Sequence, residues 1–64
     1  MKRTYAIVVH STYLSYYMTP KEDITTNYEN IMKFTNKKKA EKARKNFAKK
    51  FPVSETYLTI LEEN

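Results

Sequence analysis

The chain has 64 residues, 41% hydrophobic and 30% charged, with twelve basic side chains, seven acidic ones and a formal net charge of +5. A chain this short forms a single domain, residues 1–64, and buries only about 60% of its unfolded surface. With no cysteine and one histidine, His10, disulfides and cysteine-based zinc sites are excluded, and we expect no metal and no cofactor. Stability must come from an apolar core, with self-association as an alternative source.

The chain has no glycine. This absence excludes a P-loop, a dinucleotide-binding fingerprint, a nucleophile elbow and the glycine-containing signatures of RRM and KH domains. Turns that need a positive φ are expected at residues that tolerate it, namely Asp23, Asn27, Asn30, Asn36 and Asn46.

Residues 4–10 are rich in β-branched and aromatic side chains and predict a strand. Both of its faces are largely apolar, which indicates a central strand. Ser11 and Thr12 are expected to form a turn, and residues 13–18 a second strand that completes a hairpin.

Residues 19–22, Thr-Pro-Lys-Glu, have the pattern of a helix start, but residues 23–27 are poor helix formers. One helical turn or an ordered loop is expected there. Residues 28–34 fit both strand alternation and helical spacing, and we predict a short extended segment that enters the main helix.

A helix is predicted over residues 37–50, with Asn36 or Thr35 as its N-cap. Small and aromatic residues recur at helical spacing to form a narrow apolar stripe: Ala40, Ala43, Phe47 and Phe51. The pair Phe51–Pro52 ends the helix, because a residue before proline resists the helical conformation. Residues 55–62 then predict a last strand.

These elements predict an α+β fold, a small two-layer ββαβ domain. Its antiparallel sheet carries one amphipathic helix on one face.

The predicted helix concentrates the charge of the chain. Residues 37–50 carry eight basic side chains and one acid, Glu41, a local charge of +7, whereas the remaining residues have four basic and six acidic side chains. On a helical wheel a ridge of four lysines lies within about 30° of the side opposite the apolar stripe. The ridge consists of Lys38, Lys42, Lys45 and Lys49, and Lys37, Lys39, Arg44 and Lys50 flank it.

Like charges at this spacing destabilise a helix by about 0.2–0.5 kcal/mol per pair. Lysines in the first turn also oppose the helix dipole, but with free backbone N–H groups they suit a phosphate. The face is either a docking site for a polyanion or an ordinary solvated surface. The predicted nucleic-acid or anion-binding residues are Lys37, Lys38, Lys39, Lys42, Lys45 and Lys49.

Six tyrosines offer a second candidate surface. Aromatic side chains on an open sheet face stack bases or anchor protein interfaces, although more often they are ordinary strand residues. Tyr13, Tyr16 and Tyr17 are the predicted interface cluster. His10 has no evident nucleophile, orienting acid or additional metal ligand near it in the sequence, so we expect no catalytic residue and no enzyme activity.

Residues 33–51 and their flanking strands resemble small accessory proteins of phages and mobile elements, which share a strand–hairpin–helix–strand plan. The resemblance rests on the helix entry formed by Phe34, Asn36, Ala40 and Ala43. It implies a class of small non-enzymatic proteins that bind and redirect host machinery, and it implies no site residue.

The sequence therefore predicts a small binding protein that docks on nucleic acid or on a nucleoprotein complex through its lysine-rich helix face. The alternative is a phage-type inhibitor that binds an acidic patch on a host polymerase, nuclease or CRISPR effector. A homodimer also remains open. The chain lacks an apolar run long enough for a signal peptide or a membrane span, and we expect a cytoplasmic protein of the host cell with no membrane partner.

Overall fold

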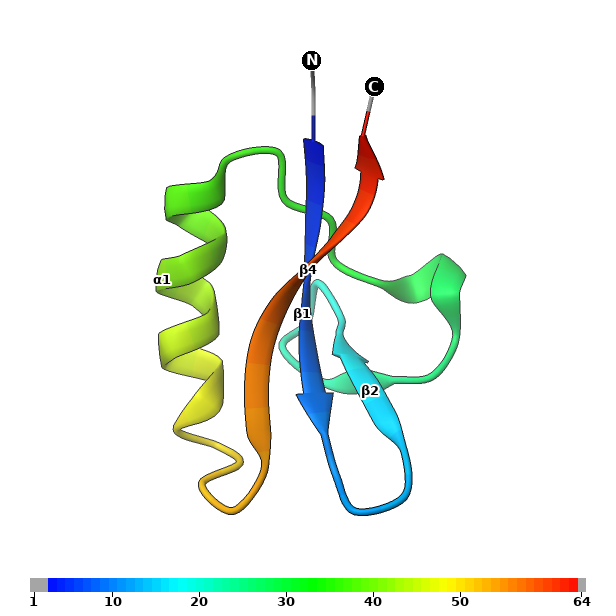
Figure 1. Cartoon of the computed structure of the whole chain (residues 1–64), viewed down its shortest axis with the longest axis vertical. Helices are drawn as coiled ribbons and strands as arrows, with labels where there is room; N and C mark the ends of the chain where they lie inside the picture. Colours follow the sequence, from blue (N-terminus) through cyan, green and yellow to red (C-terminus); the bar gives the residue numbers. More distant parts are fainter. Residues whose placement is uncertain (1–2, 64) are drawn as a thin grey trace.

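The computed structural model describes residues 3–63, with side chains for residues 3–61. Four strands form one antiparallel sheet in the order β3-β2-β1-β4, and a single α-helix lies beside it (Figure 1). The elements in chain order are β1 (Arg3–His10), β2 (Ser15–Met18), β3 (Ile24–Thr25), the 3-10 helix η1 (Tyr28–Asn30), α1 (Lys37–Ala48) and β4 (Glu55–Glu63). The predicted α+β domain with an antiparallel sheet is confirmed, and the two-residue strand β3 is an addition to it.

Strand β1 is central, as its two apolar faces predicted. It pairs with β2 on one side and along its whole length with β4 on the other. Ile7 and Val9 face the helix and belong to the core. Ala6 and Val8 alternate with them onto the opposite face and are also buried.

The main core lies between the sheet and α1. It is built from the buried residues Ile7, Val9, Met18 and Phe47, with Ile24, Met32, Phe34, Ala43, Phe51 and Leu58 packed against it. From the helix, Ala40 and Phe47 are fully buried, so the predicted apolar stripe does face the sheet. The helix itself ends at Ala48, two residues earlier than predicted, and residues 49–50 form a turn before Pro52.

The predicted hairpin between β1 and β2 forms, but β2 begins at Ser15 rather than at residue 13. The Ser11 N–H and the Ser11 hydroxyl both donate to the Leu14 carbonyl oxygen, each at 2.8 Å. These bonds close the loop and leave Tyr13 at its tip, outside the strand.

Residues 19–23 form the tight turn between β2 and β3, so the ordered-loop alternative holds and no helical turn forms. The Glu22 N–H donates to the Thr19 carbonyl and the Thr19 N–H to the Asp23 carbonyl, both at 2.9 Å. Glu22 adopts a φ of 60°. Since this φ is the only positive one among residues 3–63, the expectation that asparagine or aspartate would take such positions is wrong. The backbone bonds of the turn decide which residue takes the left-handed position.

Replacing Glu22 with glycine is expected to stabilise the protein. A left-handed conformation costs a residue with a side chain about 1–2 kcal/mol, and glycine avoids that cost but loses more entropy on folding. The net gain is about 0.5–1 kcal/mol, or a rise of a few degrees in the thermal midpoint. Thermal unfolding followed by circular dichroism measures it. Glu22→Ala is the matched control, because it keeps the backbone penalty and should give no rise.

The segment between β3 and α1 is a 3-10 turn followed by extended chain, so the predicted extended segment is confirmed for residues 31–34 and not for residues 28–30. Asn27 caps the 3-10 turn by accepting from the Glu29 N–H. Phe34 then exchanges two backbone hydrogen bonds with Tyr5 of β1, at 2.7 and 2.9 Å. This bridge fixes the point from which the chain enters α1.

Candidate functional site: the exposed face of the basic helix

The first turn of α1 is capped as predicted. The Asn36 side-chain oxygen accepts from the backbone N–H groups of Lys38 and Lys39, at 2.9 and 3.2 Å. The cap satisfies two of the N–H groups that a helix start leaves unpaired. The expectation that these groups are free for a phosphate is therefore wrong for Lys38 and Lys39, and the ammonium groups of the lysines are the main donors left to an anion at this face.

The four lysines of the predicted ridge are all exposed, while Ala40 and Phe47 on the other side of the helix are buried. The burial pattern thus places the ridge diametrically opposite the core stripe, as the helical wheel predicted. Lys38 and Lys49 stand eleven residues apart, so the ridge is about 16 Å long at the rise of an α-helix.

Two of the eight basic side chains of the segment serve the fold. Arg44 is half-buried, bonds to the Glu41 carboxylate at 3.4 Å and donates to the Thr56 carbonyl of β4 at 3.2 Å. Lys50 donates to the Glu22 carbonyl at 3.4 Å and stands 5.9 Å from the centre of the Phe47 ring. These contacts fasten the helix to the sheet edge and to the β2–β3 turn.

The other six basic side chains of the segment are exposed, and none forms a hydrogen bond or ion pair with any residue that the structure describes. They are Lys37, Lys38, Lys39, Lys42, Lys45 and Lys49, the same six that the sequence predicted as the anion-binding set. We call them the lysine face. Its acid neighbour on the helix, Glu41, is turned to Arg44, and a shallow depression runs between Glu41 and four of the lysines.

The structure does not bring the three predicted interface tyrosines together. Tyr13 lies in the β1–β2 loop with 92% of its surface exposed. Tyr16 and Tyr17 are half-buried neighbours on β2 and therefore point to opposite faces of the sheet. Since consecutive strand residues always diverge in this way, the alternation of the strand could have excluded the cluster.

The sheet face opposite the helix does carry two exposed tyrosines, Tyr28 and Tyr57, which are not among the three predicted. Tyr57 pairs across the strands with Val8 and is 44% exposed. Tyr28, 52% exposed, packs edge to face against Tyr17 with ring centres 6.1 Å apart. No sequence pattern indicated Tyr28, because its place depends on how residues 26–30 fold back over β2.

His10 lies on that same face in a row with Ser15 and Glu55, its partners on the two neighbouring strands. The His10 Nδ1 is 2.9 Å from the Ser15 hydroxyl, but no hydrogen bond joins the histidine to Glu55. A nucleophilic serine needs a base that an acid orients, and donors for the oxyanion. The row supplies neither. Among the described residues no group of three or more acids or histidines could hold a metal ion.

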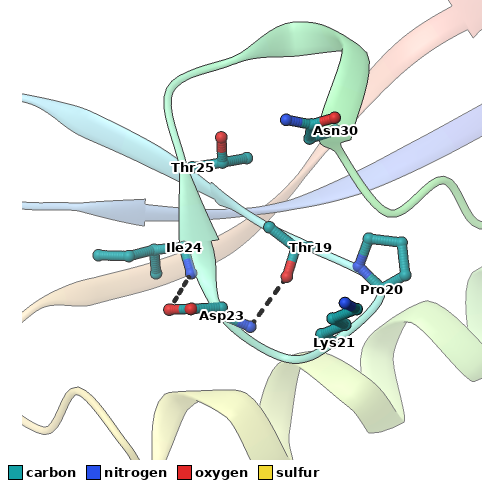
Figure 2. Close-up of a pocket in the computed structure, with 7 residues that line it drawn as sticks. All are labelled: Thr19, Pro20, Lys21, Asp23, Ile24, Thr25 and Asn30. Atoms are coloured by element: carbon teal, nitrogen blue, oxygen red, sulfur yellow. Dashed lines mark hydrogen bonds between the residues drawn. The ribbon is translucent and has the colours of Figure 1, made fainter.

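A pocket at the β2–β3 turn is lined by Thr19, Pro20, Lys21, Asp23, Ile24, Thr25 and Asn30 (Figure 2). Two of its polar side chains, Thr19 and Asp23, are occupied by the turn itself. The Thr19 hydroxyl accepts from the Asp23 N–H at 3.0 Å, and the Asp23 carboxylate from the Ile24 N–H at 2.8 Å. These groups hold the turn in shape and leave the lysine face as the stronger candidate site.

Comparisons with protein families, with curated proteins and with solved structures found no match for this chain. Within residues 3–63, no helix has the length and apolar character needed to cross a membrane. The candidate function therefore rests on the geometry and charge of the lysine face.

Proposed function

We propose that the protein docks on nucleic acid, or on a nucleoprotein complex, through the lysine face. The observation that carries the proposal is the state of its six lysines. Their side chains are exposed on one side of a single helix and unpaired within the described residues. A surface of one sign on so small a domain attracts a polyanion from a distance and raises its rate of encounter.

The arrangement of the acids supports this proposal. A helix selected only for stability places acids in its first turn and opposite charges three or four residues apart. Here the first turn has no acid, and the one acid of the helix binds Arg44 beside β4. The repulsion between the lysines destabilises the helix. A polyanion that neutralises the lysines would offset this destabilisation.

Lysine side chains act as point charges on flexible stems and contact phosphate oxygens without reading bases. We therefore propose binding that is largely independent of nucleic-acid sequence. Neutralised phosphates release counterions, and this release supplies most of the binding free energy in such complexes.

Charge reversal in the middle of the lysine face is expected to abolish binding. The double variant Lys42→Glu, Lys45→Glu is titrated with mixed-sequence duplex and single-stranded DNA in about 50 mM salt, where electrostatic binding is strong. The matched control, Lys21→Glu with Lys33→Glu, changes the net charge equally at two exposed lysines outside the helix and should retain at least half of the binding free energy. Thermal unfolding of both variants checks that they fold.

Two outcomes would count against the proposal. If the wild-type protein binds neither DNA at low salt, nucleic acid is not its partner. If both double variants lose binding equally, overall charge and not the lysine face is responsible.

An acidic patch on a host protein, such as a polymerase, nuclease or CRISPR effector, is the second candidate partner. This alternative is favoured by exposed apolar side chains in two loops, the one between β1 and β2 and the one between α1 and β4. The two loops lie at the same end of the molecule (Figure 1). Tyr13 and Val53 are 92% and 99% exposed, and Leu14 is 55% exposed. Tyrosine is enriched at the energetic centres of protein interfaces, and exposed apolar side chains that gather in one region mark an interaction surface. A single stoichiometric partner captured from host lysate, together with no DNA binding, would favour this function.

A further inference from the structure

Strand β4 has nine residues and lies at the edge of the sheet. No strand of the described chain pairs with its outer side. Up to Ile60, beyond which its register against β1 shifts, this unpaired edge is a template for another strand, and proteins generally cover or interrupt such edges.

The hydrogen bonds of β1 show which groups of β4 point outward. Tyr5 directs both its N–H and its carbonyl to Phe34, on the side of β1 away from β4. Along an antiparallel strand this direction alternates, so Ala6 and Val8 are the residues that bond to β4. Their partners there, Thr59 and Tyr57, face β1. Thr56, Leu58 and Ile60 therefore direct their backbone groups to the open edge.

One part of this edge is covered and the other is not. The Thr56 carbonyl accepts from Arg44 at 3.2 Å, which closes the half of the edge beside the C-terminal part of α1. This contact also confirms that the Thr56 carbonyl points outward. The backbone groups of Leu58 and Ile60 have no such partner among residues 3–63.

A shallow groove runs along this open half, between β4 and the N-terminal turns of α1. It is lined by Arg3, Tyr5, Lys37, Glu41, Leu58, Thr59 and Ile60. Ile60 is 48% exposed there. Lys37 is exposed and also lines the neighbouring depression of the lysine face. Apolar surface, an open backbone edge and the unpaired charge of Lys37 thus meet in one groove.

We propose that this groove takes an extended acidic segment of a partner protein, which adds to the sheet as a strand beside β4. The segment pairs its backbone with Leu58 and Ile60, lays apolar side chains on Ile60 and Tyr5, and directs carboxylates to Lys37 and the lysines beyond it. The groove lies beside the lysine face but uses different backbone groups, so this inference does not depend on nucleic-acid binding.

A second copy of the chain fits the same edge less well. Antiparallel pairing of two β4 strands around a twofold axis places both copies of α1 on one face of the joined sheet. The helix of each copy borders β4, so two basic segments, residues 37–50 with a local charge of +7 each, would meet beside the new pair of strands. Like charges at that distance oppose association, whereas an acidic segment is attracted.

The test uses the full chain and a fluorescent eight-residue peptide in which every second residue is valine or glutamate in turn and the residues between them are threonine. Both kinds of side chain then lie on the peptide face that meets the groove, and about 50 mM salt limits screening. Saturable binding is expected, with the peptide's amide protons protected from exchange. The matched control is the same peptide N-methylated at its four central residues, which keeps the charge but removes the donors on both of its edges. Its affinity should fall by at least about tenfold, since two or more backbone hydrogen bonds are lost. Equal affinity for the two peptides would mean attraction by charge alone and would overturn the proposal.

Variants of the protein test the same contact from the other side. Ile60→Pro removes an outward N–H that β1 does not use, so it should fold and yet bind the acidic peptide at least about tenfold more weakly. Val53→Pro, in the exposed loop before β4, serves as a control and should bind normally. Failure of the wild-type protein to bind the peptide would overturn the proposal. Sedimentation of a wild-type dimer that Ile60→Pro converts to a monomer would assign the edge to a second copy instead.

Discussion

Replacing Phe47 with alanine is expected to leave the protein largely unfolded at 37 °C. The Phe47 side chain is 2% exposed, belongs to the core cluster and packs 5.1 Å from the centre of the Phe51 ring. Removing a buried phenylalanine side chain costs about 3–5 kcal/mol. A domain of this size has a total stability of about 5 kcal/mol, so a single substitution removes most of it. Far-ultraviolet circular dichroism during thermal and urea unfolding measures the loss.

Two controls separate the loss of core packing from the loss of an aromatic or apolar side chain in general. Phe51 is only half-buried, so Phe51→Ala should destabilise the protein less than Phe47→Ala does. Val53 is 99% exposed, and Val53→Ala should change stability by no more than about 0.5 kcal/mol. A Phe47→Ala protein that melts within a few degrees of wild type would mean that α1 does not depend on this contact for its place on the sheet.

The parts of the fold that sequence predicted are those with strong periodicity. In the helix, alanines and phenylalanines recur at helical spacing among lysines. In β1 the short apolar run is rich in β-branched and aromatic residues, and this composition favours a buried strand. The β2–β3 turn shows the opposite case. Its path depends on which backbone groups meet across five residues, and those bonds select Glu22 for a left-handed conformation that its side chain disfavours.

The same distinction applies to the candidate site. Charge and helical geometry were enough to predict the six lysines of the lysine face. They could not show that Arg44 and Lys50 differ from the rest, because these two are occupied by the Thr56 and Glu22 carbonyls, which come close only in the folded chain. The open backbone groups of β4 could not be predicted from the sequence either. They depend on the pairing of Tyr5 with Phe34, across 29 residues of chain.

Binding to duplex DNA is expected to weaken steeply with salt. If the four ridge lysines Lys38, Lys42, Lys45 and Lys49 each neutralise one phosphate, the logarithm of the affinity should fall with the logarithm of salt concentration at a slope of about −3.6. Between 50 and 200 mM salt the affinity then drops about a hundredfold. Fluorescence anisotropy at several salt concentrations measures the slope, and single-stranded DNA should give a shallower slope of about −2.8.

The slope of the salt dependence also gives the number of phosphate contacts, which an affinity measured at one salt concentration does not give. Each ridge lysine replaced by glutamine should reduce the slope by about 0.9 on every DNA sequence alike, because a phosphate contact carries no base information. Glutamine at Lys21, which is exposed outside the helix, should leave the slope unchanged. A ridge variant that loses affinity but keeps the wild-type slope would show that the lysine face does not contact phosphate. A loss confined to some DNA sequences would show that it reads bases, which point charges cannot do.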